Sequence, residues 1–199
     1  MTPSPYGKFT TCVILNGPPG VGKDTLADLL SKHGFAKHEF KAQLYKETAQ
    51  LFNVELDEFK RRCTHRELKE TPWDKLDHIT GNPTTPRQAM IHTSEHYIKP
   101  TKGETYFGDA AAQACQDAGE SFVVFSDGGF SHEMPPILNL FKHTIICRLH
   151  RPGFDFSNDS RDYLEGYPNT FDIDLIDGRP DQAITKIFEA FSCVSRLAG

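Results

Sequence analysis

Apolar residues follow two rhythms that alternate along the chain. Short runs dense in apolar and β-branched residues predict strands, and two of these runs are apolar enough to be buried on both faces. The predicted strands cover residues 10–15, 35–40, 122–126, 144–149 and 171–176. Apolar positions at helical spacing predict helices over residues 26–32, 42–52, 85–97, 106–118 and 181–195. This alternation predicts an α/β domain with a mainly parallel five-stranded sheet.

One connection in this pattern has the composition of a phosphate-binding P-loop. It lies between the first predicted strand and the first predicted helix. Glycines let the backbone curl around phosphate oxygens with its N–H groups inward, and the helix N-terminus adds partial positive charge. The residues expected to bind the nucleotide are Gly17, Pro18, Pro19, Gly20, Val21, Gly22, Lys23, Asp24 and Thr25.

Lys23 distinguishes this loop from an ordinary turn. A structural turn would explain the glycines, but not a lysine at this spacing, which in P-loops reaches the β- and γ-phosphates. The sequence therefore predicts ATP binding and a P-loop NTPase fold of nucleotide-kinase type, with three α/β/α layers. The usual Ser or Thr after the lysine is replaced by Asp24, and Thr25 follows. Because a carboxylate is a hard oxygen ligand, Asp24 is a candidate Mg²⁺ ligand.

Length and composition narrow the functional classes. A chain of 199 residues suits one domain, and a net charge of −5 argues against tight non-specific binding to nucleic acid. The 5 cysteines include no Cys-x-x-Cys pair, so neither a zinc site nor a disulfide framework is indicated. Residues 1–7 carry no apolar signal region, and no apolar run is long enough to span a membrane. We therefore expect a cytoplasmic protein without a membrane partner.

Asp127 directly follows the third predicted strand. Ligands of parallel sheets bind beyond the carboxyl ends of the strands, so this carboxylate is placed where chemistry takes place. In P-loop enzymes a carboxylate at such a point serves the Mg²⁺ shell or accepts the proton of the acceptor hydroxyl. The structural alternative is a turn or N-cap aspartate. The P-loop favours a catalytic and metal-binding role for Asp127.

A long polar loop follows the fourth predicted strand and contains two arginines, Arg151 and Arg161. Loops of this length inside a domain are usually functional lids. Arginines on a lid can close over phosphates and stabilise charge on the transferring group, so both are candidate catalytic residues. The alternative for either one alone is a solvated surface arginine. We predict a lid at about residues 151–168.

A basic stretch over residues 60–73 ends in the only tryptophan, Trp73. Its charges and its aromatic ring suit acceptor binding, with the ring stacking on a base. An exposed helix with i,i+4 pairs such as Arg66–Glu70 would explain most of the charges. Arg87 lies in the first turn of a predicted helix, where the macrodipole disfavours a cation, and this favours a phosphate partner. The region is predicted to be a helical acceptor-binding insertion at about residues 55–105 of a single kinase domain, 1–199.

Several short motifs occur in a familiar order along nearly the whole chain. After Gly-Lys-Asp-Thr at residues 22–25 come Arg-Glu-Leu-Lys-Glu-x-Pro at 66–72, Thr-Pro-Arg-Gln-Ala at 85–89, Asp-x-x-Phe-x-x-Glu at 127–133 and Arg-Pro-Gly at 151–153. This order resembles the phage deoxynucleoside monophosphate kinase family of P-loop kinases. It also resembles related phage kinases that phosphorylate 5-hydroxymethyldeoxyuridine within DNA.

The resemblance implies a kinase that uses ATP and Mg²⁺ and acts in the host cytoplasm if phage-encoded. It also implies that Arg66 and Arg87 hold the acceptor. Lys69, Trp73 and Gln88 are further candidate acceptor-binding residues, and a homodimer is one expected partner arrangement. One position departs from the family pattern: Gly129 stands where those kinases typically carry an arginine suited to an acceptor phosphate. The acceptor is therefore either a free deoxynucleoside monophosphate or a hydroxymethyl base in DNA. A P-loop ATPase or switch without an acceptor is a third hypothesis.

Overall fold

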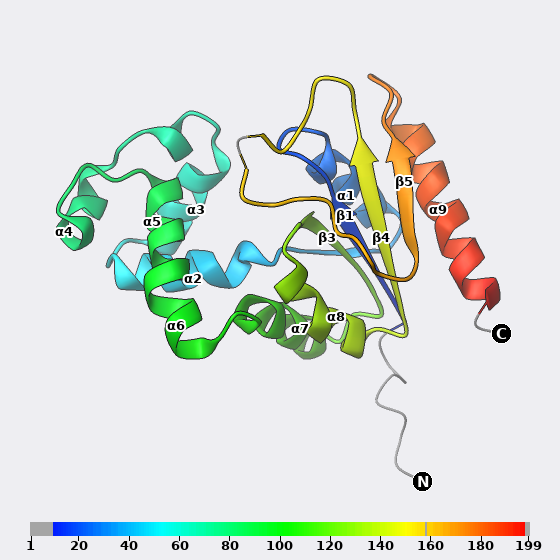
Figure 1. Ribbon diagram of the computed structural model, residues 1–199, viewed down its shortest axis with the longest axis horizontal. Coiled ribbons are helices and arrows are strands. Elements are labelled where there is room, and N and C mark those ends of the chain that lie inside the picture. The colour runs from blue at the N-terminus through cyan, green and yellow to red at the C-terminus, as the bar shows by residue number, and fades with distance from the viewer. Residues whose placement is uncertain (1–9, 158, 198–199) are drawn as a thin grey trace, which may run out of the picture. The chain divides into compact units, whose positions relative to one another are not determined.

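The computed structural model describes residues 10–157 and 159–197, so residues 1–7, for which no signal region was predicted, lie outside it. Five strands form one parallel sheet in the order β2-β3-β1-β4-β5 (Figure 1). They are β1 (Thr11–Asn16), β2 (Ala36–His38), β3 (Phe122–Gly128), β4 (His143–His150) and β5 (Thr170–Asp174). Each lies within a few residues of its predicted position, which confirms the sheet.

Helices cover both faces of this sheet (Figure 1). On one face α1 (Lys23–Lys32) and α9 (Pro180–Leu197) pack against side chains such as Val13 and Ile145. On the other face α7 (Tyr106–Ala118) and α8 (Met134–Leu140), which follows the short η4 (Ser131–Glu133), pack against Ile14 and Ile146. Neighbouring strand residues thus face opposite layers, as the period of a strand requires. The predicted three-layer α/β/α fold is confirmed.

β1 and β3 end opposite each other, and β4 continues past them to His150. Asn16, the last residue of β1, lies opposite Gly128 of β3 and opposite Arg148 of β4. Because all strands are parallel, their carboxyl ends meet at one edge of the sheet, where the connecting loops converge. The loop between β1 and α1 starts at this edge, and so does the segment after Asp127.

Residues Lys41–Phe107 form a second compact unit, and the remainder of the chain forms the first. Its elements are α2 (Lys41–Leu51), α3 (Leu56–Thr64), η1 (Leu68–Glu70), η2 (Asp74–Leu76), α4 (Asp77–Thr80), α5 (Pro86–His92), η3 (Thr93–Ile98) and α6 (Lys99–Lys102). The unit begins before the predicted start of the insertion at about residue 55, because Tyr45 and Ala49 of α2 share a core with Phe59 of α3.

The helix predicted over residues 85–97 starts as expected but continues in a wider form. Thr85 is its N-cap: the Thr85 side chain accepts a hydrogen bond from the Gln88 N–H, and the Gln88 side chain accepts one from the Thr85 N–H. From Thr93 to Ile98 the turns are those of a π-helix, a form that often occurs as a local widening inside α-helices. Among the helices of the described residues, none combines the length and apolar character needed to cross a bilayer.

Candidate active site

The loop between β1 and α1 adopts the conformation that its glycines predict. Gly20 and Gly22 have φ angles of 77° and 122°, a region that L-residues with side chains rarely adopt. A Cβ atom on Gly17 would lie 3.0 Å from the carbonyl oxygen of Leu149, so the loop also passes close to β4. Gly22 is the N-cap of α1 and provides no side-chain cap. Gly22 therefore leaves the first N–H groups of α1 uncapped, and uncapped N–H groups at a helix N-terminus are what an anion binds.

Lys23 lies inside this loop, with only 8% of its surface exposed. Its ammonium group donates hydrogen bonds to the carbonyl oxygens of Gly17 (2.5 Å) and Pro18 (2.7 Å). Burying a cation is costly unless polar groups replace its water, and these carbonyls provide that replacement. The loop therefore wraps around the amine of the one residue that the sequence predicts will reach the phosphates.

Asp24, by contrast, faces away from the loop toward the edge strand β2. Its carboxylate is mostly exposed and lies 3.6 Å from the ammonium group of Lys37, which also donates a hydrogen bond of 2.9 Å to Asp28. Burial lowers the pKa of Lys37, but the hydrogen bond to Asp28 and the charges of Asp24 and Asp28 raise it overall. The predicted Mg²⁺ role of Asp24 is untested. In this structure the carboxylate is part of a surface ion-pair cluster.

Thr25 and the start of α1 line a hollow of about 260 Å³. This is just below the range of pockets that enclose a whole drug-sized ligand, so the hollow suits one part of a nucleotide. Its walls also come from the segment after β5 and from the residue after β4. The lining residues are Gly22, Thr25, Leu26, Arg151, Leu175, Ile176, Asp177, Gly178, Arg179 and Pro180.

Arg151 stands at the rim of this hollow. Its Nε donates a hydrogen bond of 2.6 Å to Asp177, and its guanidinium lies 4.8 Å from the ring centre of Phe154. Phe154 in turn packs near Gly20, where a Cβ atom would lie 3.2 Å from its ring. The first part of the predicted lid thus lies beside the glycine-rich loop, and Arg151 lines the hollow next to it.

Asp127 ends up on the strand next to β1, because β3 pairs directly with it. The side chain is 6% exposed, and one carboxylate oxygen accepts a hydrogen bond of 2.9 Å from the backbone N–H of Phe40. The pairing of β3 with β1 therefore places a buried carboxylate and the glycine-rich loop at the same edge of the sheet.

The donors at this edge fit a Mg²⁺ ion that arrives with the nucleotide. In the described part of the chain no group of three or more His, Cys, Asp or Glu side chains could hold a metal ion by itself. Mg²⁺ commonly keeps several waters and takes one or two protein oxygens beside the substrate phosphates. The Asp127 carboxylate and the Thr25 hydroxyl are oxygen ligands of the preferred kind.

Asn16 lies at this edge of the sheet, but the pattern of apolar positions did not identify it. It is fully buried, and its amide nitrogen donates to the carbonyl oxygens of Gly128 (3.2 Å) and Asp162 (3.0 Å). Its amide oxygen accepts a hydrogen bond of 2.8 Å from the Leu164 N–H. The available signal was a polar residue at the end of an apolar strand, directly before the first glycine of the loop.

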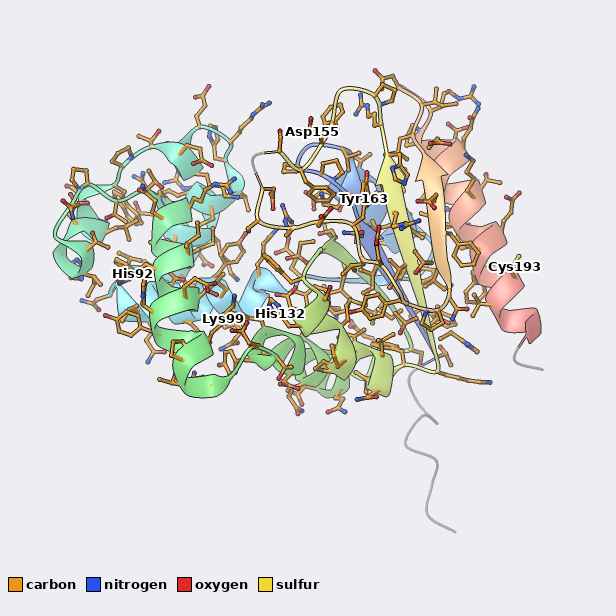
Figure 2. The ribbon with its side chains drawn as sticks, in the orientation of Figure 1. His92, Lys99, His132, Asp155, Tyr163 and Cys193 are labelled. Atoms are coloured by element: carbon orange, nitrogen blue, oxygen red, sulfur yellow. The ribbon has the colours of Figure 1, made fainter. Side chains whose placement is uncertain are left out.

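These bonds divide the segment predicted as a lid. Asp162 and Leu164 are bound to the side chain of Asn16 at the end of β1, and the hydroxyl of Tyr163 (labelled in Figure 2) donates to the carbonyl oxygen of Leu149 at 3.0 Å. The second half of the predicted range of about 151–168 is thus built into the sheet edge. Arg161, just before Asp162, belongs to this fixed part.

The predicted acceptor-binding residues lie in the second unit, and two distant segments of it come together. Arg87 of α5 donates a hydrogen bond of 2.6 Å to Glu70 of η1, and the Trp73 N–H donates one of 2.9 Å to the carbonyl oxygen of Thr84. Glu70 therefore pairs with Arg87 and not with Arg66, whose side chain is exposed. Arg66, Lys69 and Arg87 thus come from adjoining segments of one unit.

Gln88 and Trp73 have structural positions in this unit. The side chain of Gln88 completes the capping box of α5. Trp73 is only 5% exposed, and the guanidinium of Arg62 covers its ring at 4.2 Å from the centre. The prediction that Trp73 stacks on a base required an open ring face. In this structure the ring belongs to the core because its apolar area is large, and Arg62 occupies one face.

No protein-family model matches the chain, and no curated protein matches it in sequence. Two similar solved structures are a sugar kinase from Janibacter sp. HTCC2649 and a gluconokinase from Sinorhizobium meliloti 1021. The first is 16% identical with a TM-score of 0.49, covering 92% of this chain and 95% of that chain. The second is 14% identical with a TM-score of 0.44, covering 96% and 95%. The fold assignment rests on the strand order and the loop; the resemblance to phage kinases stays an interpretation of the motifs.

Proposed function

We propose that the chain is a kinase that transfers the γ-phosphoryl group of ATP to a deoxynucleotide-type acceptor, with a free deoxynucleoside monophosphate as the leading candidate. The observation that carries the proposal is the lysine enclosed by a glycine-rich loop, one strand away from a buried carboxylate. Loop N–H groups and Lys23 bind the β- and γ-phosphates, and Asp127 serves the acceptor hydroxyl or the Mg²⁺ shell. Mg²⁺ bound with the nucleotide would neutralise charge on the phosphates.

The hollow beside Thr25 supports this assignment, because apolar and arginine side chains there can receive the base and ribose of ATP. Arg151 reaches that hollow from the first part of the predicted lid. In the second unit Arg66, Lys69 and Arg87 are the cations that the sequence motifs suggest for acceptor binding. Catalysis then comes from positioning and from charge stabilisation, as phosphoryl transfer requires.

The substitution Lys23→Ala tests the proposal. We expect loss of γ-phosphate transfer by about 10³-fold or more, since the loop lysine meets the transferring group directly. Lys32→Ala is the matched control, because Lys32 is an exposed lysine in the last turn of the same helix. Radiolabelled ATP, a panel of deoxynucleoside monophosphates and base-modified DNA provide the assay, and thermal melts verify folding. Transfer by the Lys23→Ala variant at the normal rate would overturn the mechanism.

A second candidate is phosphorylation of 5-hydroxymethyluracil bases in DNA. The exposed cations Arg61 and Arg66 and the glycine at 129 favour it, whereas the net charge of −5 opposes it. DNA binding that weakens steeply with salt would support this acceptor, because phosphate contacts release counterions. ATP consumption that is independent of any acceptor would instead indicate a P-loop ATPase or switch.

A further inference from the structure

Gly129 and Arg161 occupy one space at the carboxyl end of β3. A Cβ atom placed on Gly129 would lie 2.8, 2.9 and 3.0 Å from the Cδ, Cβ and Cγ atoms of Arg161. Real Cβ contacts are longer than this, so the aliphatic stem of Arg161 fills the volume that any side chain at 129 would need. The Asp162 N–H also donates to the carbonyl oxygen of Gly129 at 3.5 Å, which keeps the two segments together.

The guanidinium of Arg161 is oriented by a single carboxylate. Its Nε and Nη2 donate hydrogen bonds of 2.8 and 2.7 Å to the two oxygens of Asp159, whose side chain is 5% exposed. This pair uses one edge of the planar group. A guanidinium has five N–H donors in a fixed fork, so the adjacent edge, formed by Nη1 and the second N–H of Nη2, stays able to bind an anion bidentately. The Arg161 side chain is 21% exposed, so this part of the molecule is accessible to a ligand.

The surroundings keep this arginine charged and place it at the site. Burial lowers its pKa, but the hydrogen bond to Asp159 and the charges of Asp159, Asp127 and Glu133 raise it overall. Asp127 is the buried carboxylate at the end of β3, and Asn16 fixes the residue after Arg161 to the end of β1. The guanidinium therefore belongs to the edge of the sheet where ligands of this fold bind.

We propose that Arg161 is a specificity-determining residue that binds an anionic group of the acceptor beside Asp127, and that Gly129 leaves the room its stem needs. This rests on the proposed function, in which the anionic group is the phosphomonoester of a nucleoside monophosphate. The arginine thus acts from the fixed segment of the chain and binds the acceptor, in place of the lid role over ATP that the sequence predicted for it.

The steric relation between Gly129 and Arg161 can be tested by thermal stability, without an activity assay. Gly129→Ala should lower the Tm by about 3–8 °C in the natural chain, because the added methyl group overlaps Arg161. In an Arg161→Ala background the same change should cost under about 2 °C, since the space is then empty. Equal shifts in both backgrounds would overturn the steric part of the proposal.

Matched acceptor pairs test the ligand: each deoxynucleoside monophosphate with its nucleoside, and gluconate with glucose. For the phosphorylated acceptors, Arg161→Ala should raise KM by about 10- to 100-fold while the KM for ATP changes less than about threefold. Gly129→Arg in the Arg161→Ala background should recover part of that loss, because the new stem enters the same space. Arg148→Ala is the matched control, since Arg148 is bound to Asp172 on the other side of β1.

The pattern of KM changes separates the two proposals. A rise in KM confined to the monophosphates supports both. Loss confined to gluconate would keep the anion role of Arg161 and overturn the deoxynucleotide acceptor. An equal rise in KM for charged and uncharged acceptors, or for ATP, would overturn the assignment of Arg161 even if Lys23→Ala abolishes transfer.

Discussion

The two units of the chain differ in where their charged side chains lie. The first unit buries Asn16, Lys23, Asp127 and Glu133, each less than 10% exposed, near the carboxyl ends of its strands. In the second unit the charged pairs, such as Arg87–Glu70 and Lys75–Glu58, lie on the surface. Burying polar groups costs free energy unless partners are provided, whereas exposed charges cost little. The comparison indicates that the first unit accepts a cost in folding free energy to hold buried polar side chains in fixed positions. The second unit keeps its charged pairs on the surface, where they cost little.

Under the proposed function, Asp127→Asn should lower kcat/KM by about 10²- to 10⁴-fold, because the amide is a poor base and a weak metal ligand. The amide oxygen can still accept the hydrogen bond from the Phe40 N–H, so the melting temperature should change little. Steady-state kinetics of γ-phosphate transfer measures this. Asp174→Asn, at the exposed end of β5, is the control. An active Asp127→Asn enzyme would remove the contrast between buried and surface charges.

Asn16→Ala should reduce the free energy of unfolding by about 2–4 kcal/mol, because three hydrogen bonds, two of them buried, lose their partner. Urea titration measures the loss. Hydrogen exchange at the Leu164 N–H should speed up as well, since that donor bonds directly to the Asn16 side chain. A change below about 0.5 kcal/mol would show that the fixed segment is held by other contacts.

Thr85→Ala should cost about 1 kcal/mol, the usual value for loss of an N-cap side chain. Thr85→Ser retains the hydroxyl and serves as the matched variant. Chemical unfolding followed by circular dichroism separates the two. If both variants are equally stable, the capping box is not what starts α5.

Arg87→Ala should change the free energy of unfolding by less than about 1 kcal/mol, because its pair with Glu70 is exposed. Under the proposed function the same change should raise the acceptor KM. Kinetics and unfolding on one preparation give both values. A large loss of stability with an unchanged acceptor KM would mean that Arg87 stabilises the second unit and does not bind the acceptor.

Asp172 tests whether exposed charges in the first unit behave like those of the second. Hydrogen bonds from Arg148 and then His150 lower its pKa, against the opposing effect of burial. Its contribution to stability is therefore present above the unfolded pKa of about 3.9 and is lost as pH falls through the lower folded value. Asp172→Asn should slightly flatten the acid side of a Tm-versus-pH curve. An unchanged curve would mean that solvent fully screens the interactions of Asp172 with Arg148 and His150.

The sequence predicted well what local pattern determines. The strands, the loop at residues 17–25, and the Thr85-Pro86 start of α5 depend on neighbours in the chain, and all are found. The pattern could not predict contacts between residues far apart in the chain. Asn16 looked like the end of an apolar run. No local signal shows that Arg161 fills the space beside Gly129, which lies 32 positions earlier in the sequence. Trp73 was expected at a binding surface, yet its apolar area favoured the core. The predicted functional roles themselves remain predictions.

The pairing register of β1, β3 and β4 restricts how this protein can vary in length. Adding or removing one residue within a strand would move Asn16, Gly128 or Arg148 by about 3.3 Å and turn the following side chains to the opposite face. The connections are under no such restriction, and the whole unit Lys41–Phe107 stands between β2 and β3. Insertions and deletions among relatives should therefore accumulate between the strands and be nearly absent within them.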